Sequence, residues 1–153
     1  MEFEFIGPND KPAMALLSTP EWLETTRAVL TELGYKAHSP PTHEEFASRF
    51  ASIQYQVVVT EVLFAAAVPS ENISLMNLQR MPMPLRRHSL LVLIGYEFES
   101  LNAMQAFQQS VHVVVNPMEL HSLGPIIQQA VAENDIALRV YRDIQSKMAA
   151  GKA

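Results

Sequence analysis

The chain has 153 residues, enough for one domain with a single core. Charged residues make up 18% and hydrophobic residues 48%, which excludes an intrinsically disordered chain. The formal net charge of −5 argues against nucleic acid as a partner, because phosphate backbones attract basic surfaces. There is no Cys, so disulfides, thiolate catalysis and thiolate zinc sites are excluded.

No apolar run approaches the about 20 residues of a membrane span, and the acidic start MEFEF lacks the basic opening of a secretory signal. We therefore expect a cytoplasmic protein with no membrane partner. The five Gly are scattered, so no glycine-rich phosphate cradle can form, and the H-E-x-x-H and G-x-S-x-G motifs are absent. These features predict that the chain is not an enzyme and holds no cofactor or metal.

Short apolar runs alternate with longer amphipathic segments, which is typical of buried parallel strands joined by helices. Residues 1–10 are expected to form an N-terminal arm. The first strand is predicted at residues 13–17, and a helix follows that begins near Pro20 and ends at Gly34. A short second strand is predicted at residues 35–38.

Thr42 and Glu45 have the spacing of a capping box, which predicts the start of a second helix. A third strand is expected at residues 55–59, and a helix near residues 72–80 that Pro82 and Pro84 terminate.

The fourth strand is predicted at residues 90–94 and the fifth at residues 111–115. A helix between them is marked by Leu101, Met104 and Phe107, and the chain is helical in character from about His121. These five strand–helix units predict a three-layer α/β sandwich with a parallel sheet of order 2-1-3-4-5, whose ligand sites lie at the carboxyl ends of the strands.

Taken in order, these segments make residues 11–132 resemble a response regulator receiver domain of the CheY-like type. The densest likeness is in LLSTPEWLETTRAVLTELGYKAHSPPTHEEFASRF. The third, fourth and fifth strands of receivers are matched by YQVVVTE, LLVLIGY and VHVVVNPMEL. The resemblance implies a flavodoxin-like fold and a role in signal transduction, as in two-component systems.

The residues that receivers use for phosphorylation are replaced here. Receivers have two acids after the first strand, an acceptor Asp after the third, Thr or Ser after the fourth and Lys after the fifth. The matching positions hold Ser18 and Thr19, Glu61, Gly95 and Asn116. Only Glu61 offers a charged oxygen ligand, so tight Mg²⁺ binding is not expected. We therefore predict a degenerate pseudo-receiver that acts independently of phosphorylation.

Each replacement also has a structural interpretation. Ser18 and Thr19 fit plain helix caps, with Glu21 completing a capping box if Ser18 is the cap. The Glu61 carboxylate either lies where a phosphoryl group would, holding an active-like state, or faces solvent. A register shift of one residue would place Thr60 there instead. Because receivers have a cis peptide at the matching position, Pro117 is a candidate cis-proline.

Candidate contact surfaces come from charge and from the resemblance. The basic cluster of Arg80, Arg86, Arg87 and His88 is either a solvated charge run or a docking point for an acidic partner. The five His are scattered, which favours surface or hydrogen-bonded roles over a metal pair. The face with which receivers commonly dock would include Leu101, Met104, Gln105, Gln108, His112 and Val114.

The helical pattern continues to about Met148, although a receiver-like sheet needs its last helix only to about residue 131. Residues 133–153 are therefore predicted to form a C-terminal helical extension. Heptad positions in it are apolar except for Asn134. The predicted dimerisation residues are Asn134, Ile136, Ala137, Val140, Tyr141, Ile144 and Met148. In the alternative, the helix breaks at residues 133–135 and folds back on its own domain.

The sequence thus favours a non-catalytic protein-interaction module that forms a homodimer and docks on an unidentified signalling, motility or regulatory protein. A second hypothesis is a switch that responds to phosphorylation or to a small ligand in an atypical pocket around Glu61. A third, an enzyme on a flavodoxin-like scaffold, would need a convergent set of polar groups that the sequence does not present.

Overall fold

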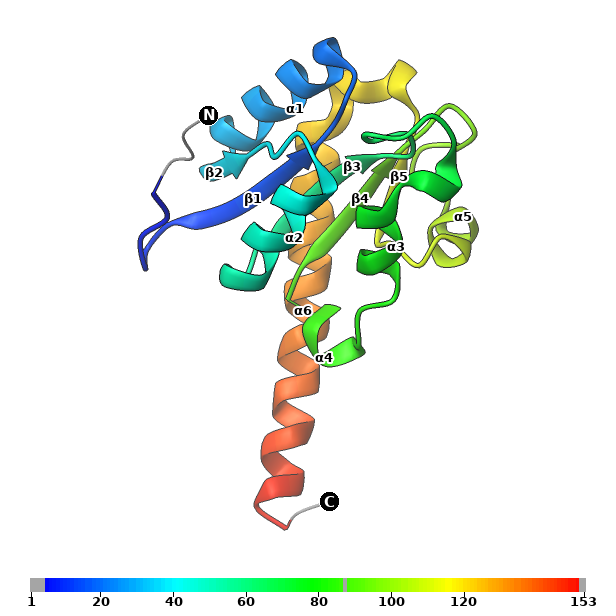
Figure 1. Cartoon of the computed structure of the whole chain (residues 1–153). Coiled ribbons are helices and arrows are strands. Elements are labelled where there is room, and N and C mark those ends of the chain that lie inside the picture. The colour runs from blue at the N-terminus through cyan, green and yellow to red at the C-terminus, as the bar shows by residue number, and fades with distance from the viewer. Residues whose placement is uncertain (1–4, 87, 152–153) are drawn as a thin grey trace.

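The computed structural model describes residues 5–86 and 88–151. One sheet of five parallel strands lies at its centre, in the order β2-β1-β3-β4-β5 (Figure 1). The strands are β1 (Lys11–Leu16), β2 (Tyr35–His38), β3 (Val57–Glu61), β4 (Leu90–Ile94) and β5 (Val113–Val115). The predicted fold class and strand order are confirmed.

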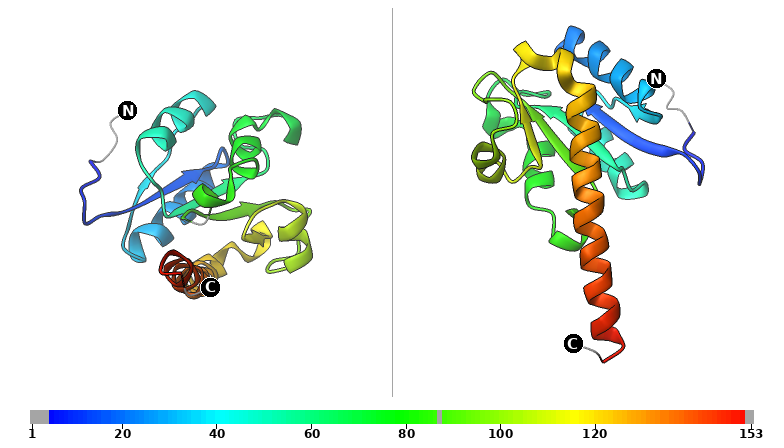
Figure 2. Two further views of the ribbon diagram at one scale, coloured as in Figure 1. Left: turned by 90° about the horizontal axis from the view of Figure 1, so that it is seen from below. Right: turned by 180° about the vertical axis from the view of Figure 1, so that it is seen from behind.

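Helices cover both faces of the sheet, which makes the three layers visible in Figure 2. α1 (Pro20–Glu32) and α6 (Leu123–Ala149) pack on one face. The other face carries α2 (His43–Ser52), α3 (Ile73–Gln79) and α5 (Ala103–Gln108). The remaining elements are α4 (Met83–Arg86) and the two 3₁₀ helices η1 (Pro69–Glu71) and η2 (Pro117–Ser122).

The sheet divides the core into two halves because successive side chains of a strand point to opposite faces. In β3, Val57 and Val59 pack with α1 and α6, whereas Val58 packs with α2 and α3. All three are fully buried, as expected for a central parallel strand covered on both faces.

Local signals in the sequence set several helix ends. The hydroxyl oxygen of Thr42 accepts the N–H of Glu45 at 3.2 Å, so the predicted cap of α2 is confirmed. Asn72 caps α3 by accepting the N–H of Leu75 at 3.1 Å. Gly34 follows α1 with φ 91°, the left-handed conformation that favours glycine after a helix.

Several elements differ from the sequence prediction: β1 begins at Lys11 and not at residue 13, and β5 begins at Val113 and not at residue 111. β3 ends at Glu61 and not at Val59, because its pairing with β4 continues to Glu61, which lies opposite Ile94, and the polar Thr60 and Glu61 are buried. The one-turn α4 forms where Pro82 and Pro84 predicted only a break; Pro84 lies in its first turn, where a missing N–H costs nothing.

α6 is one continuous helix of 27 residues, about 40 Å long at 1.5 Å per residue. The predicted alternative of a break at residues 133–135 is therefore wrong. The red end of α6 projects well beyond the sheet (Figure 1). We call residues 134–149 the distal part of α6. The division of the chain at residues 10 and 132 into an arm, a domain and an extension stays a prediction.

None of the helices formed by residues 5–86 and 88–151 combines the length and apolar character needed to cross a membrane.

Candidate functional site

The loops at the carboxyl ends of the strands form the crest of the sheet, and all the predicted pocket residues lie there. They follow or end four different strands and are Ser18, Thr19, Glu61, Gly95 and Asn116. The structure thus brings together positions up to 98 residues apart in the chain. Their roles differ from position to position.

Glu61 joins the end of β3 to the loop between β1 and α1. Its Oε1 accepts the backbone N–H groups of Ser18 at 2.5 Å and of Thr19 at 2.7 Å, and its Oε2 accepts the Thr19 hydroxyl at 3.0 Å. Only 5% of Glu61 is exposed, so the expectation of a carboxylate facing solvent is wrong. The negative charge lies beside the N-terminus of α1, where backbone amides and the helix dipole stabilise it.

Ser18 and Thr19 are not the plain helix caps that the sequence suggested. Thr19 occupies the N-cap position of α1 but makes no side-chain capping bond, because its hydroxyl donates to Glu61. The Ser18 hydroxyl oxygen accepts the N–H of Ala65 at 2.7 Å and so holds the loop after β3. Thr60 is buried, and its hydroxyl donates to the Glu61 carbonyl, so Thr60 does not take the place of Glu61.

Gly95 is buried directly after β4, where receivers have a hydroxyl side chain. A Cβ at this position would overlap the Glu97 carboxylate and would lie 2.9 Å from Cγ2 of Val62. Glu97 therefore fills the space that a Thr or Ser would need.

Asn116 organises the loops after β4 and β5. Its side-chain amide donates to the carbonyls of Tyr96 at 3.2 Å and Phe98 at 2.9 Å, and its Oδ1 accepts the N–H of Met118 at 2.9 Å. The predicted cis peptide before Pro117 is wrong: the described chain contains no cis peptide. A trans Pro117 fits the first position of η2, which Asn116 caps.

A pocket of about 490 Å³ opens over the crest, and Glu61 is the buried acid in its wall. Trp22 and Tyr96 also line it, with ring centroids 5.6 Å apart in an edge-to-face arrangement. Sequence reasoning missed both aromatic residues. Their positions in the chain could have indicated them, because Trp22 lies in the first turn of α1, the helix after β1, and Tyr96 lies two residues after β4. We call this cavity the crest pocket.

Among residues 5–86 and 88–151, no cluster of three or more His, Asp or Glu side chains is arranged to hold a metal ion. Three of the five predicted scattered His have hydrogen-bond partners within the domain. His38 pairs with the Tyr55 hydroxyl at 2.6 Å and His43 with the Ser74 hydroxyl at 2.7 Å, while His112 Nδ1 accepts the N–H of Leu91 at 2.9 Å. Burial raises the pKa of Tyr55 to about 12.

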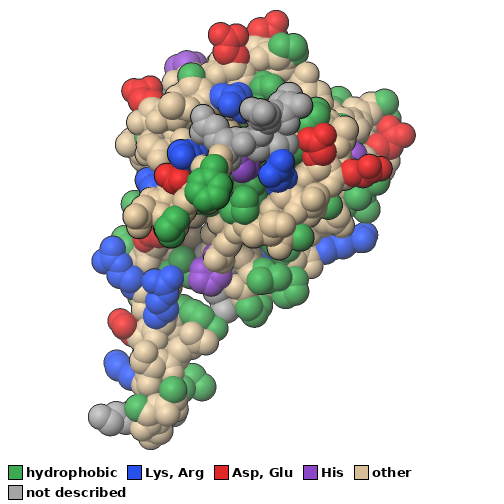
Figure 3. Space-filling model, turned by 60° about the vertical axis from the view of Figure 1, so that its left-hand side comes forward, with side chains coloured by type: hydrophobic (Ala, Val, Ile, Leu, Met, Phe, Trp, Pro, Cys, Tyr) green, Lys and Arg blue, Asp and Glu red, His purple; other side chains and the backbone are tan. Residues whose placement is uncertain are grey.

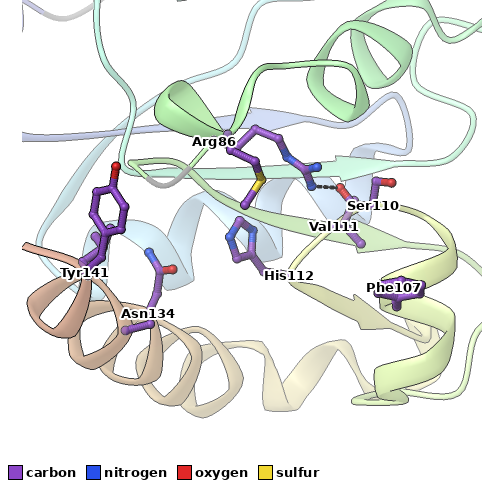
Figure 4. A pocket seen from close by; sticks show the side chains of 10 residues that line it. Arg86, Phe107, Ser110, Val111, His112, Asn134 and Tyr141 are labelled. Carbon is purple, nitrogen blue, oxygen red and sulfur yellow. Dashed lines mark hydrogen bonds between the residues drawn. The ribbon is translucent and has the colours of Figure 1, made fainter. Parts of the chain in front are cut away.

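A second cavity of about 580 Å³ lies between α4, the loop before β5 and α6 (Figure 4). Arg86 donates to the Ser110 carbonyl across it. Burial lowers the pKa of His112, and the nearby Arg86 adds to the effect. Arg86 is therefore a partly buried structural residue and not part of a solvated charge run. Arg87 lies outside the described residues.

Only part of the docking face predicted from the resemblance is exposed at the surface. Val114 is fully buried in the core, whereas Met104 is 64% exposed. Leu101 and Phe107 are 59% and 80% exposed, because the six-residue α5 packs on the sheet mainly through Ala106. Together Leu101, Met104 and Phe107 form an exposed apolar patch, which we call the α5 patch.

The distal part of α6 exposes apolar side chains. Ile136 is 59%, Val140 54%, Ile144 53% and Met148 62% exposed, while Tyr141 is half-buried. In Figure 3 this segment carries charged side chains along one side and hydrophobic side chains along the other. Asn134, Ala137 and Tyr141 line the wall of the cavity in Figure 4. The predicted dimerisation residues are thus divided between an exposed stripe and a cavity wall.

No protein-family model matches the chain, and no curated protein matches it by sequence. Several solved structures, in contrast, are similar to the chain in fold. A response regulator receiver domain (CheY-like) from Methylobacillus flagellatus aligns with a TM-score of 0.53 at 16% identity, over 80% of this chain and 99% of that one. A putative pilus assembly-related protein from Burkholderia pseudomallei aligns with a TM-score of 0.57 at 13% identity, over 84% and 95%.

A fusion of the trimeric coiled-coil residues 181–211 of yeast Spc42 with another structure aligns over 99% of this chain and 94% of that one. Its TM-score is 0.63 and its identity 12%. At such identities, likeness shows the fold alone. This chain has the fold of CheY-like response regulator receiver domains, with a long C-terminal helix.

Proposed function

We propose that this chain is a pseudo-receiver that acts in signal transduction or regulation by binding other proteins and not by phosphoryl transfer. Two copies associate through the distal part of α6. The observation that carries the proposal is the exposed apolar stripe on that helix. An unidentified signalling or regulatory protein in the cytoplasm is the further partner.

The crest supports a structural rather than a chemical role for its polar residues. Phosphoryl transfer in a receiver needs an acceptor carboxylate, metal-binding acids and a cation that offsets developing charge. Here the Glu61 carboxylate holds the N–H groups of Ser18 and Thr19, and Asn116 stands where the cation would be. The amide of Asn116 is itself used by the carbonyls of Tyr96 and Phe98.

The distal part of α6 supports self-association. Contiguous exposed apolar surface marks interfaces in soluble proteins, and burying it yields roughly 25 cal/mol per Å². Ile136, Val140 and Ile144 follow one another at four-residue spacing and therefore lie along one side of the helix.

The α5 patch is the proposed docking surface for the second protein. It comes from α5 and from Leu101, which precedes that helix, and not from α6. Exposed aromatic and Met side chains of this kind are enriched in the cores of protein interfaces.

Sedimentation equilibrium tests the homodimer. The full chain is expected to sediment as a dimer. Val140→Glu with Ile144→Glu is expected to sediment as a monomer, because each substitution puts a charge into a stripe that the dimer would bury. Ser146→Glu is the matched control, since Ser146 lies on the opposite side of the helix. A monomeric wild-type chain, or a double variant that still dimerises, contradicts the proposal.

A switch that responds to a small ligand is the second candidate function, and the crest pocket favours it. Trp22 lines that pocket and is the single Trp of the chain, so its fluorescence reports on occupancy. Titration with acetyl phosphate and Mg²⁺ is expected to leave the emission unchanged. A saturable change would support the switch and count against the interaction-only function.

A further inference from the structure

Five residues of α6 form a stripe that is symmetric about Val140. Glu133, Ile136, Val140, Ile144 and Lys147 follow one another at spacings of three, four, four and three residues. Residues three and four apart are neighbours on one side of a helix, so the five share a face. All five are exposed. The stripe has an acid at one end, a base at the other and apolar residues between them.

We propose that a second copy of this chain pairs with this stripe in an antiparallel orientation, with a two-fold axis at Val140. The pairing rests on the proposed homodimer and specifies its geometry. Ile136 then packs against the partner's Ile144, and Val140 against the partner's Val140. Such an interface is self-complementary and closes as a dimer.

Charge complementarity selects this orientation. In the antiparallel pair Glu133 faces the partner's Lys147, and this contact occurs twice. In a parallel pair in register, each acid would face the same acid and each base the same base. Like charges opposite each other are unfavourable, and charges beside an apolar seam commonly determine helix orientation.

The face that the stripe occupies becomes exposed only where the helix leaves the core. The buried side of α6 is formed by Leu123, Ile126, Ile127 and Ala130, and Ile126 lies one heptad before Glu133 on the face of the stripe. Gln129 continues the stripe toward the domain and is exposed. Its Nε2 donates to Glu133 at 3.1 Å, an exposed contact within the helix that leaves the carboxylate accessible to a partner.

The opposite side of the distal part is mostly polar. Asp135, Arg139, Arg142 and Ser146 lie there and are exposed, whereas Leu138 is half-buried and lines the cavity shared with the domain. Ile136, Val140 and Ile144 therefore form one exposed apolar face, as two paired helices require. With the stripes aligned at Val140, the two domains lie toward opposite ends of the helix pair.

Cysteine pairing tests the orientation, because the chain has no Cys of its own. Glu133→Cys and Lys147→Cys are prepared as separate full-length proteins and oxidised alone and after mixing. A disulfide needs Cα atoms within about 7 Å. In the antiparallel dimer, positions 133 of the two copies lie about 21 Å apart along the axis, whereas 133 faces 147.

Disulfide-linked dimer is expected only in the mixture of the two variants. Linked dimer in either variant alone would show parallel pairing and overturn the inference. The absence of linked dimer in all three samples would also overturn it. Sedimentation separates the two proposals: a wild-type dimer without the mixed disulfide contradicts only the antiparallel geometry, whereas a wild-type monomer contradicts the homodimer itself.

Charge exchange gives a second readout. Glu133→Lys alone and Lys147→Glu alone are each expected to weaken the dimer roughly tenfold, because two attractive contacts become repulsive. The double exchange restores the attraction and is expected to return the dissociation constant to the wild-type value. A double variant as weak as the single ones would overturn the pairing.

Discussion

The crest and the distal part of α6 use their side chains in opposite ways. At the crest polar groups are buried and pair with one another, so that the carboxylate of Glu61, at 5% exposure, satisfies two amides and a hydroxyl of the same chain. On the distal part of α6 large apolar groups are exposed, Ile136 at 59% and Met148 at 62%. The first arrangement stabilises the monomer, and the second leaves surface available for another molecule.

Removing the distal part of α6 beyond Asp135 is expected to have the largest effect. A chain that ends at Asp135 keeps the core contacts of α6 up to Ala130 and should remain folded. It should sediment as a monomer at all concentrations at which the intact chain is dimeric. Circular dichroism confirms folding. A truncated chain that remains dimeric would place the interface elsewhere.

Breaking the crest should destabilise the fold and leave self-association intact. Glu61→Gln removes the negative charge and replaces Oε2, the acceptor of the Thr19 hydroxyl, by an NH₂ group that cannot accept, so that the Ser18 and Thr19 N–H groups keep only a neutral acceptor. We expect a loss of about 2–3 kcal/mol in the free energy of unfolding, measured with urea.

Glu99→Gln is the matched control, because Glu99 is exposed and lies outside the crest pocket. It should change the unfolding free energy by less than about 0.5 kcal/mol. Equal effects of the two substitutions would show that the Glu61 hydrogen bonds contribute little.

The smallest expected effect is a pH dependence of stability caused by His112, which lines the cavity beside α6. Burial and Arg86 lower its pKa in the folded chain below the ordinary value of 6.5. The unfolded chain therefore binds a proton first as the pH falls through about 6.5, and stability decreases until the folded-state pKa is reached. The urea midpoint should fall between pH 7.5 and pH 5.5 more in the wild type than in His112→Gln. Identical slopes would contradict this assignment.

The sheet could be predicted from the sequence because its signals are local. Apolar runs located the strands, and Thr42, Gly34 and Asn72 lie at helix ends that hydrogen bonds or backbone conformation define. The strand order then followed from the spacing of the units and from the resemblance to receivers. The exposed apolar residues of α6 could also be predicted from a local signal. The helical periodicity of the sequence continues beyond about residue 131, where a receiver-like sheet no longer needs its last helix.

The position of the crest could be predicted from the sequence, but the hydrogen bonds within it could not. The bonds of Glu61 join residues 42 and 43 positions apart, which no local pattern shows. Leu101, Met104 and Phe107 had apolar periodicity but became exposed, since α5 is short and Leu101 precedes it with φ 68°. Trp22 and Tyr96 were missed because neither lies at a position that receivers use for phosphorylation.

The central claim is that the crest does not carry out phosphoryl transfer. Incubation of the intact chain with acetyl phosphate and Mg²⁺, followed by intact mass measurement, tests it most directly, with a phosphorylatable receiver domain treated in parallel. The mass is expected to remain that of the 17.1 kDa chain while the reference domain gains a phosphoryl group. A stable gain of one phosphoryl group by this chain would contradict the claim.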